Sequence, residues 1–387
     1  MRNAKSSIGV ILRDLPIRSS NRGSGVRLHT FAKTAIVGSL ALLGALTMAA
    51  TDAPTYRITR SISLGSPDSW DYVAYDESSH HVFVSHFDRV TVVDEPSGTV
   101  IGQVTSFPGG THGIAISAAQ HRGYTDDSAA GIAASFDLST FMVQKRLQAK
   151  DDADGMAFDP VSAHVFVIDG DSGFVTVIDP KTDAVIANVS VGSKLEFAVA
   201  GRNGKLYVND AGKNEIVRID TKTNQIDAHW PMAGCERPHG LAIDSETHRL
   251  FSTCPNQVME VVNAENGAIV ATLPIGKGTD AAAFDPKRKR AFSSNGQDGT
   301  LTVVQELGPN SFIVIDTVST AVSGRTMAID PDSGRIFIAA AQVVDESPAP
   351  SSAALPAASG SAPGASPRRR LPIVPGSLKL LILDPAS

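Results

Sequence analysis

From residue 55 onward, apolar residues fall in short β-branched runs with alternating positions, and long helical spacing is missing. One unit recurs there: a strand of small residues, a turn that often begins with Asp, and a strand with an aromatic residue. These aromatic positions lie 41 to 45 residues apart, at Phe83, Tyr124, Phe166, Tyr207, Phe251, Phe292 and Phe337. Seven units at this period predict a repeat protein whose units pack on their neighbours.

Each unit predicts four strands. Runs such as Val175–Asp179 supply the third strand, and runs such as VIANVSVG supply the fourth. Four strands in about 42 residues are typical of a propeller blade. We therefore predict an all-β chain, a single seven-bladed β-propeller over residues 51–387 with four-stranded antiparallel blades. The blades are expected to begin near residues 70, 111, 153, 195, 238, 279 and 325.

The two ends of the repeat region fit together. The seventh unit has its first two strands, Leu378–Asp384 supplies a third, and the chain then ends without a fourth. Residues Tyr56–Ser66 precede the first unit, belong to no blade of their own, and end in a sequence like that of other fourth strands. We therefore expect the N-terminal strand to pair with the C-terminal blade, which would close the ring without a free edge.

Two segments differ from the repeats. Residues 1–50 hold seven Lys and Arg followed by an apolar stretch at Ala35–Ala50 that ends in small residues, which predicts a secretory signal peptide. We therefore expect a periplasmic or extracellular protein, with no membrane span after cleavage. Residues 343–376 are rich in Pro, Ala and Ser, so we expect a disordered insert within blade seven. Its Arg368–Arg370 run is a basic cluster that could bind an acidic surface or partner.

The repeats resemble the YVTN β-propeller family, including the exported YncE-like proteins. The resemblance rests above all on residues 164–192 (HVFVIDGDSGFVTVIDPKTDAVIANVSVG) and 205–226 (KLYVNDAGKNEIVRIDTKTNQI). It implies an exported propeller that acts as a binding or scaffold module, since fold alone does not fix chemistry. Some such proteins are proposed to bind nucleic acid. Without the leader, however, 27 Lys and Arg stand against 39 Asp and Glu, and this net charge of −12 disfavours nucleic acid as a partner.

A column of polar residues precedes the small-residue strands. In a propeller the chain enters each blade near the central channel, so this column is expected to surround the channel mouth. Its members are Asp71, His112, Asp154, Glu196, His239, Asp280 and Arg325. A hydrated channel needs polar walls, so the column fits a plain polar lining as well as a ligand site. Carboxylate and imidazole groups could also bind Ca²⁺ or Zn²⁺, with Asp154, Glu196 and His239 as candidate ligands, or act as general acids and bases.

Two further sets of Asp residues recur. The loops between second and third strands should lie on the face that carries the channel mouth, and they predict an acidic top face through Asp88, Asp126, Asp127, Asp169, Asp171, Asp210 and Asp298. Loops at strand ends favour Asp in any case. In five units an Asp is followed five residues later by His or Arg, which suggests a structural contact across the first hairpin. These pairs are Asp76 with His81, Asp159 with His164, Asp244 with Arg249, Asp285 with Arg290, and Asp330 with Arg335.

The chain has two cysteines, Cys235 and Cys254, on either side of the fifth unit's first hairpin. An oxidising compartment would allow a disulfide between them, although free thiols and a Cys/His metal site are alternatives. A C-x-x-C-H motif for covalent haem is absent from the sequence.

We expect a monomeric, non-catalytic module that binds a small molecule or protein through the channel mouth and acidic top face. The alternative is a metal-dependent, lactonase-like hydrolase with its ion in the channel. The sequence holds no diagnostic nucleophile motif, so an enzyme is the less favoured of the two interpretations.

Overall fold

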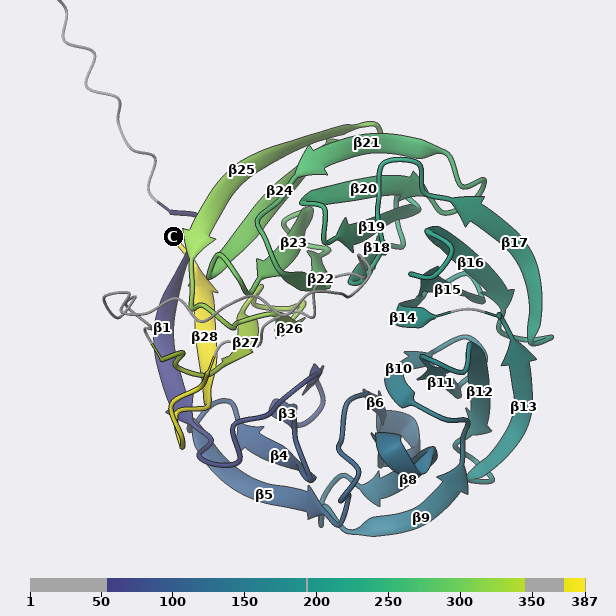
Figure 1. Ribbon diagram of the computed structural model, residues 1–387, viewed down its shortest axis with the longest axis vertical. Coiled ribbons are helices and arrows are strands. Elements are labelled where there is room, and N and C mark those ends of the chain that lie inside the picture. The colour runs from purple at the N-terminus through teal and green to yellow at the C-terminus, as the bar shows by residue number, and fades with distance from the viewer. Residues whose placement is uncertain (1–53, 193, 345–371, 387) are drawn as a thin grey trace, which may run out of the picture. The chain divides into compact units, whose positions relative to one another are not determined.

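A computed structural model describes residues 54–192, 194–344 and 372–386. The chain divides into residues Met1–Thr51 and a compact unit, Asp52–Ser387, and only the second is described here. That unit consists of seven four-stranded antiparallel sheets arranged in a ring (Figure 1). The predicted all-β, seven-bladed propeller is therefore confirmed. The expected signal peptide lies outside the described residues, among which no helix is long and apolar enough to cross a membrane.

The two inner strands of each blade carry the small-residue segment and the aromatic position. The innermost strands are β2 (Val73–Asp76), β6 (Ile114–Ser117), β10 (Ala153–Asp159), β14 (Leu195–Ala200), β18 (Leu241–Asp244), β22 (Thr279–Asp285) and β26 (Thr326–Ile329). The second strands are β3 (His81–His86), β7 (Arg122–Asp127), β11 (His164–Asp169), β15 (Lys205–Asp210), β19 (Arg249–Cys254), β23 (Arg290–Asn295) and β27 (Ile336–Ala340).

The two outer strands complete each blade. The third strands are β4 (Arg89–Asp94), β8 (Ile132–Asp137), β12 (Phe174–Asp179), β16 (Glu215–Asp220), β20 (Val258–Asn263), β24 (Thr300–Gly308) and β28 (Lys379–Pro385). The outermost strands are β5 (Thr99–Thr105), β9 (Val143–Gln148), β13 (Ala184–Ser190), β17 (Gln225–Pro231), β21 (Ile269–Pro274), β25 (Ser311–Ser319) and β1 (Tyr56–Ser63). Two short 3-10 helices, η1 (Ala118–Gln120) and η2 (Ser128–Ala130), lie in blade two.

Small residues in the innermost strands let neighbouring blades approach closely. Gly240, just before β18, lies so near β22 that a Cβ atom there would be 2.5 Å from the backbone carbon of Ala281. The seven aromatic side chains of the second strands are all 0% exposed and belong to the cores between blades. Some also bond to the next blade: the Tyr124 hydroxyl donates to Asp183 Oδ1 at 3.0 Å. Large buried rings thus hold adjacent sheets together.

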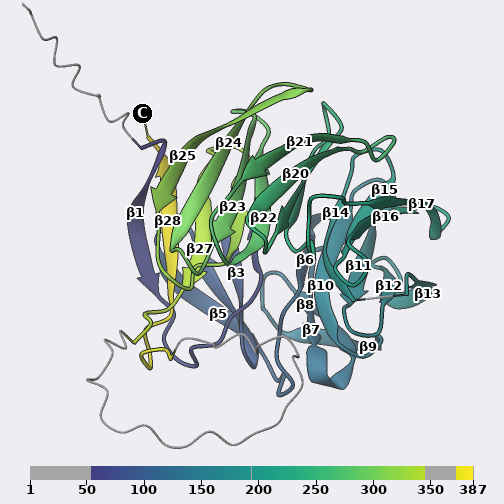
Figure 2. The same ribbon diagram turned by 45° about the horizontal axis from the view of Figure 1, so that its top comes forward.

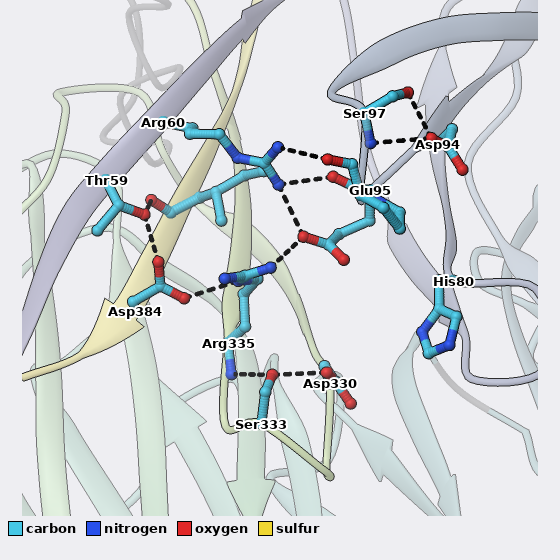
Figure 3. A network of polar contacts seen from close by, with 12 residues as sticks. Thr59, Arg60, His80, Asp94, Glu95, Ser97, Asp330, Ser333, Arg335 and Asp384 are labelled. Carbon is cyan, nitrogen blue, oxygen red and sulfur yellow. Dashed lines mark hydrogen bonds and ion pairs between the residues drawn. The ribbon is translucent and has the colours of Figure 1, made fainter.

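Blade seven combines the two ends of the propeller. Strand β1 pairs antiparallel with β28, from Tyr56 opposite Pro385 to Ser63 opposite Lys379 (Figure 2). A polar network then joins this blade to blade one (Figure 3). Glu95 Oε1, just after β4, accepts hydrogen bonds from Arg60 of β1, at 2.7 Å, and from Arg335, just before β27. The pairing expected between the N-terminal strand and the C-terminal blade is therefore present.

The insert in blade seven is anchored at both flanks. Val343 forms an antiparallel bridge with Ile373, and the Val344 amide donates to the Pro372 carbonyl at 2.7 Å. Residues 345–371 lie outside the described residues. Disorder of the insert stays a prediction, and the backbone groups of its flanking residues find partners in each other.

The recurring Asp residues of the first hairpins lie opposite their predicted partners, but the side chains of Asp159 and Arg335 bond elsewhere. Asp159 and His164 are cross-strand partners, as are three of the other predicted pairs, and the Asp330 amide donates to the Arg335 carbonyl at 2.8 Å. The Asp159 carboxylate, however, accepts a hydrogen bond from the Ser162 amide at 2.9 Å, and Arg335 bonds to Asp384 at 2.7 Å. The predicted structural contact across the first hairpin is therefore confirmed at the backbone, whereas the short Asp side chain reaches the amides of its own turn.

Candidate functional site

The seven polar residues of the predicted column stand where each blade begins. Three of them, Asp154, Glu196 and Asp280, lie at irregularities where the inner strand's pairing register shifts. The other four lie in the connections that lead into their strands. Bulges re-aim side chains, and they are common beside functional sites. The irregularities therefore help to place these side chains beside their neighbours from adjacent blades.

One arm of the column is a chain of ionic contacts. His239 Nδ1 lies 3.5 Å from Glu196 Oε2 and 3.3 Å from Asp280 Oδ1. Arg325 then contacts Asp280 at 2.8 Å and Asp71 at 3.5 Å. Burial would raise the pKa of Asp280, but His239 and Arg325 outweigh it and hold that pKa below its usual value. Four blades are thereby linked to blade one through charged groups.

The other arm is built around His112. Its Nδ1 atom lies 3.7 Å from Asp126 Oδ1 and 3.8 Å from Asp154 Oδ1. Burial opposes the imidazolium, but the carboxylates of Asp126, Asp71 and Asp154 outweigh it and raise the pKa of His112 to about 9. The fully buried Asp126 accepts the backbone amides of His112, at 2.8 Å, and Gly113, at 2.6 Å, while burial raises its own pKa to about 7.

Three carboxyl groups of the mouth have pKa values above their usual values. Burial, followed by the charge of Asp71, raises the pKa of Asp154 well above its usual value. Burial is also the largest cause of the raised pKa values of Asp71 and Glu196. Neighbouring carboxylates add to the effect because like charges disfavour each other in a site of low polarity. The mouth therefore holds more acidic groups than its own cations neutralise.

An aromatic pair that the sequence did not reveal joins opposite sides of this site. Tyr72 of blade one stacks on Phe197 of blade four, with ring centroids 4.3 Å apart and planes 17° from parallel. Both rings are half-buried. The position directly after each column residue is Gly, Ala or Thr in the other five blades. That contrast is the signal by which the sequence could have singled out Tyr72 and Phe197.

The predicted acidic top face is wrong for four of its seven residues. Asp126, Asp127, Asp169 and Asp210 are between 0% and 4% exposed, whereas Asp88, Asp171 and Asp298 remain accessible. Asp169, for example, accepts the Lys150 amide at 3.2 Å and the Thr176 hydroxyl at 2.7 Å. Carboxylates at the ends of second strands turn inward because loop amides need acceptors there. Much of the expected surface charge therefore serves as internal anchoring.

The three candidate metal ligands are not gathered at one point. Glu196 and His239 lie in contact, but Asp154 contacts His112, on the other arm. Within the described residues, no three His, Cys, Asp or Glu side chains are arranged to hold a metal ion. The Ca²⁺ or Zn²⁺ site considered from the sequence therefore stays a prediction, with Glu196 and His239 as the two of its three candidate ligands that lie in contact.

A disulfide lies beside the channel mouth. Cys235 and Cys254 are bonded, with Cα atoms 5.5 Å apart, and are 2% and 0% exposed. Of the alternatives left open by the sequence, the structure contains the disulfide. The bond fastens the connection that leads to His239 onto strand β19, so it helps to place that imidazole.

Comparisons with known proteins support the fold more than the function. No family model matches the chain. The chain is 24% identical over 179 residues to YncE of Salmonella typhimurium, a protein described as uncharacterized, and this match covers 45% of the chain and about half of the relative's length, 49%. The match therefore does not assign an activity to this chain.

Two solved structures are similar to this chain in fold, at lower sequence identity. Kuenenia stuttgartiensis hydrazine synthase has a TM-score of 0.60 at 13% identity and covers 70% of the chain and 92% of its own. A chain of the mitotic checkpoint complex has a TM-score of 0.63 at 13% identity and covers 81% and 95%. These matches establish fold alone. The protein is thus a seven-bladed β-propeller similar to YncE.

Proposed function

We propose that this protein is an exported, non-catalytic binding module that recognises a small ligand or a partner through its channel mouth. The observation that carries the proposal is that polar side chains from all seven blades meet in two arms of ionic contacts. The ring of Tyr72, stacked on Phe197, lies within the electrostatic reach of carboxyl groups from both arms. Convergent polar groups beside aromatic rings are typical of ligand sites. Each side chain comes from a strand entry fixed by its own sheet, so the site is preorganised.

Export is supported by two features. The first is the basic and apolar leader in residues 1–50. The second is the disulfide, since such bonds persist mainly in oxidising compartments. Cell fractionation and N-terminal sequencing test this part of the proposal. A mature chain that begins near residue 51 outside the cytoplasm is expected, and an uncleaved cytoplasmic chain would contradict it.

Binding at the mouth is tested with a chemically mixed library of cations, anions and neutral molecules. Thermal unfolding of the purified protein would be compared with that of an Asp154→Asn, Glu196→Gln variant. A ligand that binds only the native state raises the melting temperature, and that rise should be lost in the variant. The control is Asp298→Asn, which removes an exposed acidic group of the same face. If every ligand acts equally on all three proteins, the channel mouth is not the binding site.

The metal-dependent hydrolase is the competing hypothesis, and the contact between Glu196 and His239 is the observation in its favour. Metal content after purification without chelators distinguishes the two. One equivalent of ion, lost in the double variant, would replace the binding-module proposal with the hydrolase.

A further inference from the structure

The channel mouth already shows how it holds a guanidinium group. The Arg325 side chain contacts the carboxylates of Asp280 and Asp71, at 2.8 and 3.5 Å. Its Nη2 atom donates to the Trp70 carbonyl at 2.9 Å, and its Cζ atom lies 5.4 Å from the centre of the Trp70 ring. Two carboxylates and an aromatic face are the groups that favour a planar organic cation.

The opposite side of the mouth repeats these components. Asp154 of blade three lies 3.8 Å from the imidazole of His112, and Glu196 of blade four lies 3.5 Å from that of His239. These imidazoles take the place that the guanidinium of Arg325 has between Asp71 and Asp280. The neighbouring aromatic groups are Tyr72 and Phe197. The Tyr72 phenol lies within the electrostatic reach of both carboxylates, which contribute to its raised pKa after burial. Tyr72 therefore stays neutral and keeps its hydroxyl proton available for donation.

We propose that this second half of the channel mouth binds a small organic cation, an alkylammonium or alkylguanidinium group, between Asp154 and Glu196 and against the rings of Tyr72 and Phe197. The inference rests on the proposed function and names the class of its ligand. An added organic cation would bring further positive charge to Asp154 and Glu196, as Arg325 does for Asp71 and Asp280. The rings add attraction for a weakly hydrated cation, which a hard metal ion would not share to the same degree.

Charge and shape both limit the alternatives. An anion would meet the carboxylates of Asp71, Asp154, Glu196 and Asp280, whereas the guanidinium of Arg325 is already shared by two of them. A neutral alkyl compound would use the rings but would leave the carboxylates unchanged. The apolar part of the ligand should lie against the aromatic pair, so an alkyl chain is expected to strengthen binding of the cationic group.

The experiment is calorimetric titration of the purified protein at constant ionic strength with n-butylguanidinium, n-butylammonium, n-butanol and CaCl₂. We expect both organic cations to bind, and n-butanol and Ca²⁺ to bind at least tenfold more weakly. The Asp154→Asn, Glu196→Gln variant should lose the cation binding. Phe197→Leu keeps apolar volume but removes the ring, and should raise the dissociation constant about three- to tenfold. The control, Asp298→Asn, should bind as the native protein does.

Three results would overturn the inference: equal binding of n-butanol, tighter binding of Ca²⁺, or unchanged cation binding by the double variant. Circular dichroism and a cooperative melt show whether each variant is folded, and Tyr72→Phe serves as a milder second test of the aromatic side. If other library compounds still depend on Asp154 and Glu196 while both organic cations fail, the ligand class is wrong and the binding-module proposal stands. If no compound depends on these residues, the proposed function fails as well.

Discussion

Two glutamates at equivalent positions have opposite surroundings. Glu95 and Glu306 each follow the third strand's core positions, and each amide donates to a carbonyl at the end of the first hairpin. Glu95 accepts a hydrogen bond from Arg335 of the preceding blade (Figure 3). In the corresponding place, Arg249 instead donates to the Pro309 carbonyl at 2.6 Å. Glu306 is 6% exposed and, unlike Glu95, has no ion-pair partner among the described residues.

This difference predicts a pH-dependent stability. Burial, reinforced by the charge of Asp244, raises the pKa of Glu306 from 4.5 to about 7. Between these two values the folded state holds a proton that the unfolded state has released, so stability falls as pH rises from 4.5 to about 7. Glu306→Gln removes the charge and should raise the free energy of unfolding by about 1–3 kcal/mol at pH 8, with little effect at pH 4.

Urea unfolding of native and variant protein across this pH range measures the effect. The matched control is Glu236→Gln, which neutralises an exposed carboxylate and should leave the pH profile unchanged. A constant difference between native and Glu306→Gln protein at all pH values would show that the Glu306 carboxyl group does not titrate with a raised pKa.

At the residue scale, the sequence predicted where the column residues lie better than it predicted which side chains they contact. The column residues could be aligned because each precedes a recognisable strand. That His112 meets Asp126 and Asp154, however, depends on the register shift at Asp154 and on the burial of Asp126. Loop composition suggested surface for Asp126, whereas the backbone amides of strand entry required a buried acceptor. Contacts of this kind come from tertiary packing, which a local pattern does not contain.

At the scale of elements, every outermost strand has the same irregularity. In each blade the pairing between the third and fourth strands shifts register by one residue. The extra residue is Ile186 in β13 and Asp227 in β17, for example. A bulge twists an exposed edge and interrupts its free hydrogen-bonding groups, which discourages pairing with another chain. Seven repetitions indicate that the propeller protects all of its edges in one way.

The innermost strands predict a sharp requirement for glycine. Gly240→Ala would place a methyl group 2.5 Å from the backbone carbon of Ala281 and 2.5 Å from the backbone nitrogen of Ala282. Backbone atoms of a neighbouring sheet move only if two blades separate, so we expect a loss of about 1–3 kcal/mol in the free energy of unfolding. Gly308→Ala is the control, since nothing lies within 4 Å of its added Cβ atom. Equal stability of the two variants in urea would show that blades five and six adjust freely.

At the scale of the whole molecule, the repeat carried most of the predictive information. Seven aligned aromatic positions predicted seven sheets, and the missing fourth strand of the last unit predicted the partner of Tyr56–Ser63. The charged junction of Arg60, Glu95 and Arg335 was not predicted, because these residues are far apart in sequence and meet only when blades one and seven are neighbours. The repeat length in the sequence defines each blade, but contacts between the first and last blades form only when the ring is complete.

The pairing of β1 with β28 predicts that stability depends on the N-terminal strand. A chain that begins at residue 65 would lose β1, leave the β28 edge unpaired and expose Leu381 and Leu383, which are now 7% and 0% exposed. It would also lose the Arg60 contact with Glu95. We expect a lower melting temperature, a broader transition and association of chains through the open edge, measured by calorimetry and sedimentation. The control chain begins at residue 54, keeps β1 and should remain cooperative. A chain from residue 65 that melts like this control would show that the other six blades, with three strands of the seventh, are sufficient, and that the terminal pairing contributes little to the stability of the ring.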